Sequence, residues 1–308
     1  MSIKPFPIAA FVTDIHLQAS APVARSNEKD WIATQASYLA QWKALKEKYK
    51  IPGFIGGDIF DKHKGSPELI TMAMDYLEGD YAVAGQHDLP YHDYDQAHKS
   101  AYGVLVRSGT ITDINGEYIG MQTNGVPFRV HGFGWNNPIS NEDNLCDFSV
   151  ALCHSYFWMK EHSYVGADKA KNKVAYKKKL QGFKAAIFGD NHKGFQTKSG
   201  NCNVVNNGVF MRRKSDELDY QPCMTLLYSD GSLERVEVDC SNDVYLDPQA
   251  LKRMIGEVEG LDIEGFVEEL QKLGDTGLDY RLAVTTYMDK KNVSKNVRKI
   301  IIDILEHE

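Results

Sequence analysis

Apolar and polar positions follow two alternating patterns along most of the chain. Short, almost wholly apolar runs occur at residues 8–13, 53–57, 81–84, 150–153 and 185–188. Such runs are typical of strands buried on both faces, because a half-exposed strand would alternate apolar and polar residues. Longer amphipathic stretches lie between them. The pattern predicts a layered α/β fold with a largely parallel sheet.

Two helices and a hairpin are predicted around these strands. Ser26 or Asn27 can cap a helix that runs to about Lys48, with apolar residues spaced for one buried face. Ser66 precedes a proline at the first position of a second helix. Residues 222–238 contain two apolar stretches around a Ser-Asp-Gly turn, which indicates two strands joined by that turn.

The end of the chain has a different character. Residues 247–308 contain several helical patterns, and the last of them carries an apolar stripe. The stripe consists of Val297, Ile300, Ile301, Ile304 and Leu305. It must pack on the chain's own domain, on a second copy in a homodimer, or on another protein. We therefore predict two domains, residues 1–246 and a small helical module of residues 247–308.

The apolar runs end at residues that bind metals. Their ends carry Asp14 and His16, Asp58, the segment Gln86-His87-Asp88, His154, and Asp190 with His192. The carboxyl ends of parallel strands meet at one edge of a sheet, so these side chains should converge. Carboxylates and imidazoles together bind divalent metals, and several of each can hold two ions.

This ordered set of motifs resembles the calcineurin-like metallophosphoesterases, and it is most similar to the SbcD-type DNA repair exonucleases. The segment Gly56–Asp61, the turn Asn207–Arg213 and the two strands after that turn favour the SbcD type. The resemblance implies a layered β-sandwich with flanking helices. It also implies a hydrolase that cleaves DNA phosphodiester bonds with two metal ions, in DNA repair, recombination or replication.

The resemblance assigns a role to each metal ligand. Asp14, His16 and His192 match the residues that hold the first ion. Asp58 matches the carboxylate that bridges both ions, which keeps two cations roughly 3.5 to 4 Å apart from repelling one another. His154 matches a ligand of the second ion.

Two residues depart from the family at the second ion. Gln86 stands where the family has Asn, and Asp190 stands where it has His. Both are expected to bind the second metal, with Asn191 as a substitute if Asp190 points away. Hard oxygen ligands favour Mn²⁺, or else Mg²⁺, over Zn²⁺.

His87 and Asp88 are the implied catalytic pair. His87 would act on the departing oxygen of the phosphodiester, and Asp88 would orient its ring through the other ring nitrogen. Asp61 is expected to support the metal ligands without binding a metal itself.

The net charge and the local basic residues give opposite indications about a DNA partner. The formal net charge of −7 argues against nucleic-acid binding, which depends mainly on Lys and Arg. Basic residues nevertheless occur on both sides of the Asp190 motif. The candidates for weak DNA contact are Lys177, Lys178, Lys179, Arg212 and Arg213. A solvated helix face explains the lysine run equally well.

Partner, location and alternatives follow from the same observations. The resemblance implies that the C-terminal helices dock on an SbcC-type ATPase. The five cysteines lack a Cys-x-x-Cys spacing and no apolar stretch could span a bilayer, so we expect a cytoplasmic protein. Two other functions fit: a phosphoesterase for a small molecule or protein, and a noncatalytic subunit with a degenerate second metal site.

Overall fold

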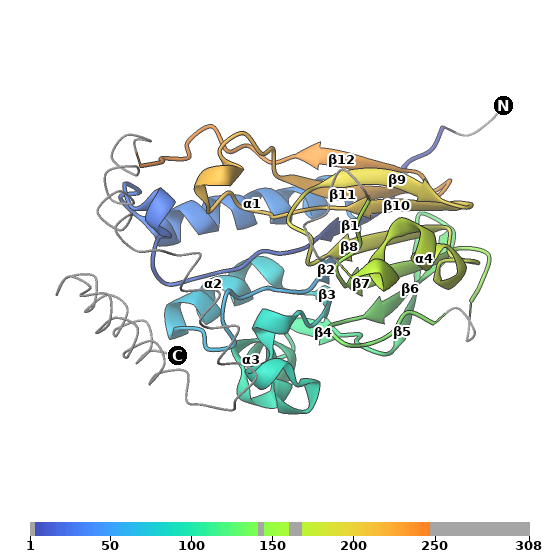
Figure 1. Ribbon diagram of the computed structural model, residues 1–308, viewed down its shortest axis with the longest axis horizontal. Coiled ribbons are helices and arrows are strands. Elements are labelled where there is room, and N and C mark those ends of the chain that lie inside the picture. The colour runs from blue at the N-terminus through green and yellow to red at the C-terminus, as the bar shows by residue number, and fades with distance from the viewer. Residues whose placement is uncertain (1–3, 141–144, 160–167, 247–308) are drawn as a thin grey trace. The chain divides into compact units, whose positions relative to one another are not determined.

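The computed structural model describes residues 4–140, 145–159 and 168–246 (Figure 1). Two six-stranded sheets pack together, with helices on the outer face of each. The predicted layered α/β sandwich is therefore confirmed. The helices are α1 (Trp31–Tyr49), α2 (Pro67–Leu77), α3 (Ala101–Arg107) and α4 (Lys173–Lys179).

The first sheet has the order β12-β11-β1-β2-β3-β4. Its strands β1 to β4 run parallel, and β11 and β12 form the predicted hairpin that pairs antiparallel with β1. The strands are β1 (Pro7–Val12), β2 (Gly53–Gly56), β3 (Asp80–Val83), β4 (Ile111–Asp113), β11 (Cys223–Tyr228) and β12 (Leu233–Glu237).

The second sheet has the order β5-β6-β7-β8-β10-β9. Strands β6, β7, β8 and β10 are parallel, and β5 and β9 close the edges antiparallel. The strands are β5 (Tyr118–Thr123), β6 (Val126–Phe133), β7 (Ser149–His154), β8 (Ala185–Gly189), β9 (Phe195–Ser199) and β10 (Cys202–Asn206).

Three apolar clusters hold these layers together. The middle cluster lies between the sheets, where Phe11 and Phe54 of the first sheet meet Val130 and Leu152 of the second. A second cluster packs α1, α2 and α3 on the first sheet, and a third packs α4 on the second sheet. Both faces of the central strands are thus covered, which explains their unbroken apolar sequence.

The first helix begins later than predicted. Its N-cap is Asp30, whose carboxylate accepts a hydrogen bond from the backbone N–H of Ala33 at 2.9 Å. Ser26 and Asn27 are therefore wrong as caps. Val23–Arg25 form a short 3-10 turn, and the N–H of Ser26 closes that turn by donating to the carbonyl of Val23.

Buried charges tie the segment after β12 back to α1. The carboxylate of Asp243 accepts hydrogen bonds from Arg25 at 2.7 Å, Tyr38 at 2.8 Å and Arg212 at 2.8 Å. Arg25 is fully buried and also pairs with Glu28. We call Asp243, Arg25, Tyr38 and Arg212 the Asp243 cluster.

The compact unit that contains the two sheets ends at Tyr245. Residues 247–308 lie outside the described residues, so the helical module, its boundary and its apolar stripe remain predictions. Docking on an ATPase and homodimer formation remain predictions for the same reason. Among the described helices, none combines the length and apolarity that crossing a membrane requires.

Candidate metal centre

The predicted ligands meet at the carboxyl ends of strands from both sheets. Strand β1 leads to Asp14 and His16, β2 to Asp58, and β3 to the turn Gln86–Asp88. In the second sheet, β7 ends in His154 and β8 leads to Asp190 and His192. The sandwich therefore brings together residues that lie as far as 178 positions apart in the numbering, from Asp14 to His192.

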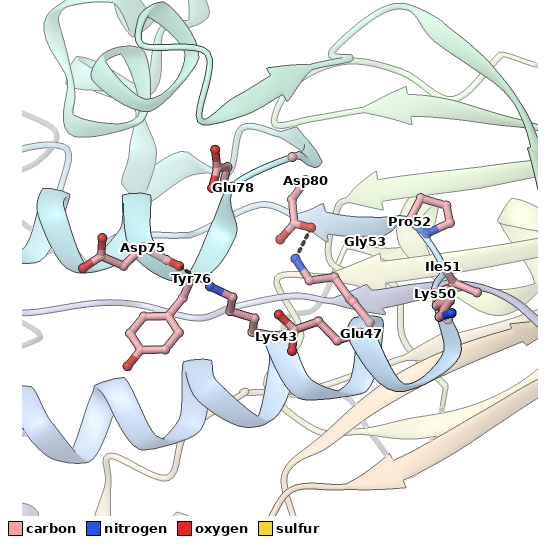
Figure 2. Close-up of a pocket in the computed structure, with 12 residues that line it drawn as sticks. Lys43, Glu47, Lys50, Ile51, Pro52, Gly53, Asp75, Tyr76, Glu78 and Asp80 are labelled. Carbon is pink, nitrogen blue, oxygen red and sulfur yellow. Dashed lines mark hydrogen bonds and ion pairs between the residues drawn. The ribbon is translucent and has the colours of Figure 1, made fainter.

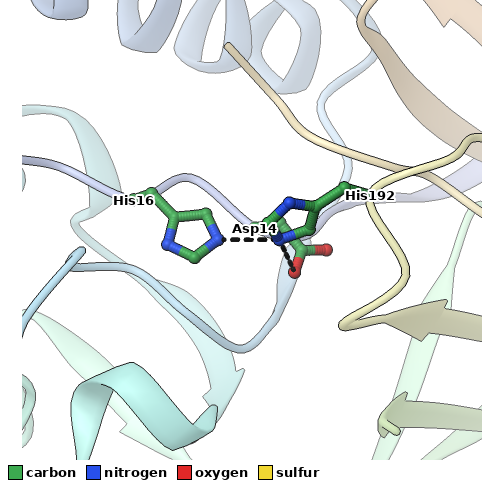
Figure 3. A group of neighbouring side chains, drawn as sticks. All are labelled: Asp14, His16 and His192. Atoms are coloured by element: carbon green, nitrogen blue, oxygen red, sulfur yellow. Dashed lines mark hydrogen bonds and ion pairs between the residues drawn. The ribbon is translucent and has the colours of Figure 1, made fainter. Parts of the chain in front are cut away.

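Asp14, His16 and His192 form the first ligand group (Figure 3). The Nε2 atoms of His16 and His192 lie 3.3 Å apart, and Asp14 Oδ1 lies 3.9 Å from His192 Nε2. Two nitrogens each about 2.1 Å from one ion, at tetrahedral or octahedral angles, would lie roughly 3.0 to 3.4 Å apart. The facing imidazoles therefore have the spacing of two ligands of one ion.

Asp58 lies between the two ligand groups. Its Oδ2 atom is 3.7 Å from His16 Nε2 on one side and 3.3 Å from His154 Nε2 on the other. Its Oδ1 atom accepts a hydrogen bond from the backbone N–H of His87 at 2.9 Å, which fixes the carboxylate. This placement fits the predicted role of a carboxylate shared by two ions.

The second group contains both residues that depart from the expected motif. Gln86 Oε1 lies 2.7 Å from His154 Nε2, and Gln86 Nε2 donates to Asp190 Oδ1 at 3.0 Å. The Nδ1 atom of His154 lies 2.7 Å from the carbonyl of Gly56, an arrangement that directs Nε2 toward an ion. Asn191 does not replace Asp190 here, since its buried side-chain amide donates to the carbonyl of Phe157 at 2.9 Å.

Two buried carboxylate oxygens at this centre lack the partners that burial demands. Within the described part of the chain, Asp14 Oδ2 and Asp58 Oδ2 accept no hydrogen bond, and Asp58 Oδ2 has the His154 ring as an ion-pair partner at 3.3 Å. Leaving a carboxylate oxygen buried without a donor or a cation is costly. The donor set of carboxylates, imidazoles and an amide suits divalent cations, so the residues present fit a metal centre.

The pKa values of His154 and Asp14 indicate competition between a proton and a cation. Burial favours the neutral form of His154, but the charges of Asp58 and Asp14 outweigh it and raise the pKa of His154 to about 10. Burial raises the pKa of Asp14 to about 7 against the opposing charge of His154. A proton on His154 thus balances the carboxylates, and metal binding at Nε2 would release it.

The imidazoles of the first group are held neutral. Burial and the nearby charge of Arg213 lower the pKa of His16 well below its usual value. The same two causes, joined by Lys214, lower the pKa of His192 to about 3. Neutral imidazole is the form that binds metal, so both rings are ready as ligands at neutral pH.

His87 lies beside the metal ligands His16 and Asp58. Asp88, however, has a different role from the one predicted. The Nδ1 atom of His87 lies 2.8 Å from the backbone carbonyl of Asp61. The carboxylate of Asp88 instead accepts from the backbone N–H groups of Ile59, Phe60 and Gly85 at 3.0 to 3.3 Å. The expected orientation of the ring by Asp88 is therefore corrected: Asp61 orients His87, and Asp88 joins the loops after β2 and β3.

The ligand loops have an unusual backbone. Asp14, His16, Asp58 and Asp190 all adopt positive φ, between 52° and 78°. Non-glycine residues in this region cost about 1 to 3 kcal/mol each, and they concentrate at functional sites. Gly85 allows the close approach, because a Cβ there would lie 2.0 Å from Asp58 Oδ1.

The basic residues predicted to contact DNA do not lie together in the way that the metal ligands do. Arg212 belongs to the Asp243 cluster, and Arg213 pairs with Asp61 beside the metal centre, so both guanidinium groups are engaged within the protein. Lys177 and Lys178 line a hollow of about 470 Å³ with residues that precede β8 and with the turn between β9 and β10, whereas Asp190 follows β8. Lys179 lies over the ring of Tyr176. DNA contact by these lysines remains a prediction.

A larger hollow of about 570 Å³ lies at the amino ends of β2 and β3, opposite the ligand-bearing ends (Figure 2). Its buried group is Asp80, which accepts from Trp42 Nε1 at 2.7 Å and pairs with Lys46. Burial raises the pKa of Asp80 to about 6, against the opposing charge of Lys46. These contacts tie α1 to β3, and we assign them a structural role.

Sequence reasoning missed a set of residues beside the ligand loops, which we call the aromatic rim: Tyr91, His92, Trp135 and Lys171. His92 and Trp135 have ring centroids 6.3 Å apart, and Lys171 Nζ lies 5.4 Å from the centre of the Trp135 ring. Trp135 follows β6, which runs parallel to β7 and so ends at the same edge as His154. The sequence signal was weak, because Arg129 and His131 interrupt the apolar residues of β6.

Comparison with known proteins gives one family and several distant structures. Residues 9–194 match the family described as calcineurin-like phosphoesterase. The calcineurin-like phosphoesterase YfkN from Bacillus subtilis is 14% identical, with a TM-score of 0.49 over 83% of this chain and 97% of that one. A putative 5′-nucleotidase from Staphylococcus aureus is 13% identical, with a TM-score of 0.49 over 81% of this chain and 58% of that one. No match was found among curated proteins.

Proposed function

Because the chain belongs to the calcineurin-like phosphoesterase family, we propose that it is a two-metal-dependent DNA nuclease of the SbcD type. Membership implies a metal-dependent hydrolase of phosphoesters. The observation that carries the proposal is Asp58 Oδ2, buried without a donor among the described residues and lying between His16 Nε2 and His154 Nε2. A shared carboxylate is the element that lets two ions act together.

Each group of the centre has a defined task in this proposal. Divalent ions, when bound, supply an activated water and neutralise charge on the phosphate. Asp14, His16 and His192 would hold one ion, and His154, Gln86 and Asp190 would hold the other. Gln86 and Asp190 support a working second site because Gln86 contacts His154 and also donates a hydrogen bond to Asp190.

His87 is placed to act on the leaving group. With its Nδ1–H held by the carbonyl of Asp61, the protonated ring has one N–H left, at Nε2. That N–H can donate to the oxygen that departs from phosphorus. The backbone N–H of His87 meanwhile holds Asp58, so the turn Gln86–Asp88 couples the leaving-group side of the reaction to the shared metal ligand.

The SbcD type is supported by contact between two segments that suggested it. Asp61 ends the segment Gly56–Asp61, and Arg213 ends the turn Asn207–Arg213. The two side chains form an ion pair, and the backbone of Asp61 contacts His87. The segments therefore share a position beside the proposed acid, which gives both of them a role in the same reaction.

Metal replacement tests this function. Protein stripped with a chelator should recover hydrolysis of single- and double-stranded oligodeoxynucleotides with Mn²⁺, and much less with Zn²⁺, because Asp190 and Gln86 offer hard oxygen ligands. The measurement is the initial rate of DNA cleavage across a series of divalent metals. Cleavage that survives chelation without added metal would contradict the proposal. Hydrolysis of nucleotides or phosphoproteins with none of DNA would favour the alternative phosphoesterase function.

A further inference from the structure

Tyr91 is an exposed aromatic residue directly after the loop of the proposed acid. Its exposed fraction is 91%, and both Tyr91 and the following His92 adopt positive φ, at 57° and 56°. Large side chains rarely occupy this backbone region, and two in succession without a glycine are rarer still. A strained turn that presents an aromatic ring to solvent indicates a use for that ring.

Hydrogen bonds attach the aromatic rim to the metal centre from two directions. His92 Nδ1 lies 3.0 Å from the carbonyl of Gln86, whose side chain contacts His154. The backbone N–H of Trp135 donates to the carbonyl of Ala84, just before the same turn, at 2.9 Å. His92 and Trp135 are therefore anchored to Gln86 and Ala84, at the start of the turn that carries Gln86 and the proposed acid His87.

The rim also combines aromatic rings with positive charge. Lys171 is half-buried over the ring of Trp135 and comes from the short turn Lys169–Lys171, ahead of α4. A nucleic acid offers a partner for each of these groups, because every phosphate of its backbone has a base next to it. Aromatic rings stack on bases without regard to sequence, and a neighbouring lysine neutralises a phosphate.

We propose that Tyr91 is the stacking surface for the nucleobase next to the scissile phosphodiester, with Lys171 facing an adjoining phosphate. This proposal rests on the nuclease function proposed above. It names the substrate more closely, as DNA with an unpaired base at the cleaved linkage. A base inside a duplex already stacks on its neighbours and would have to leave them to reach Tyr91.

Variants of Tyr91 combined with base-free DNA test the proposal. Tyr91→Asn removes the ring but suits the backbone, because Asn tolerates positive φ. Tyr91→Phe keeps the ring, and Tyr91→Leu keeps much of the volume without aromaticity. Each variant is assayed with Mn²⁺ on a single-stranded oligodeoxynucleotide and on the same strand built from abasic tetrahydrofuran residues.

On the normal strand, kcat/KM should fall about 10-fold for Tyr91→Asn and for Tyr91→Leu, and stay near wild type for Tyr91→Phe. The abasic strand should lower kcat/KM of the wild type by a similar factor, and Tyr91→Asn should add little to that loss. Equal losses for Tyr91→Asn on both strands would overturn the proposal, since the effect would not depend on a base. An unchanged kcat/KM for Tyr91→Asn on normal DNA would overturn it as well.

The wild-type protein separates this proposal from the nuclease function. If wild type hydrolyses bis(p-nitrophenyl) phosphate but no oligodeoxynucleotide, the nuclease function fails and the stacking role fails with it. If wild type cleaves DNA while the Tyr91 variants cleave it equally well, only the stacking role fails.

Discussion

Replacing His87 with alanine should lower turnover on DNA by about 10²- to 10⁴-fold, the usual contribution of a positioned general acid. Metal content and DNA affinity should stay near wild type, because the ring is assigned to the leaving group and not to an ion. The measurements are kcat with Mn²⁺, metal stoichiometry by elemental analysis, and DNA binding by fluorescence anisotropy.

Two further variants serve as controls for His87→Ala. Asp58→Ala should lose metal as well as activity, because Asp58 lies within reach of both ligand groups. His98→Ala alters an exposed histidine whose contact is the carbonyl of Asp95, and it should resemble wild type. The structure makes the metal measurement decisive, since His87, His16 and Asp58 have ligand atoms within 4.8 Å of one another. Loss of a metal equivalent in His87→Ala would show that His87 is a ligand and that its assigned role is wrong.

The largest loss in the free energy of unfolding is expected for Asp243→Ala. Arg25 is fully buried and the Asp243 side chain is only 2% exposed, so the substitution leaves a buried charge with fewer partners. Removing one partner of such a pair costs about 3 to 5 kcal/mol. Glu28 still pairs with Arg25, so we expect the lower end, about 3 kcal/mol, or a fall in Tm of roughly 6 to 12 °C.

Asp239→Ala is the matched control for this prediction. Asp239 lies in the same segment and is exposed, and its carboxylate accepts a hydrogen bond from the backbone N–H of Ser241 in a local turn. Its hydrogen bonds with Gln41 are made by backbone atoms, which the substitution keeps. Its replacement should leave the free energy of unfolding close to that of the wild type, as is usual for surface positions. The comparison is made by thermal and urea unfolding. Equal stability of the two variants would show that the Asp243 cluster contributes little to the fold.

The sequence was informative about the metal centre because each ligand ends an apolar strand. The strand ends predicted that Asp14, Asp58, His154 and His192 converge, and the structure confirms it. Parallel strands place their carboxyl ends at one edge, so strand order was not needed for this prediction. The same logic located Gln86 beside His154, with Asp190 in contact with Gln86.

Contacts that depend on loop direction were not predictable in this way. Asp88 adjoins His87 in sequence, yet the short 3-10 turn Gln86–Asp88 places its carboxylate among backbone N–H groups of two loops. The ring of His87 instead contacts the backbone of Asp61, and a carbonyl has no sequence signature. Likewise, the lysine run reads as one patch, but the direction of α4 carries Lys177 and Lys178 away from the ligand end of β8.

One hairpin was missed although its signal was present. Strands β5 and β6 are joined by Asn124-Gly125, both at positive φ, which is the turn that Asn-Gly favours. Exposed and partly buried residues alternate along β5, so it lacks the unbroken apolar run that marked the central strands. The aromatic rim follows from this hairpin, because β6 leads to Trp135.

Anomalous diffraction from crystals soaked in Mn²⁺ would show whether the centre holds two ions. We expect two anomalous peaks, one among Asp14, His16 and His192 and one beside His154, with Asp58 touching both. Gln86 and Asp190 should contact the second peak, since Gln86 already faces His154 and Asp190 contacts Gln86. A single peak at the first group, with Gln86 and Asp190 still bonded to each other, would contradict a two-metal centre.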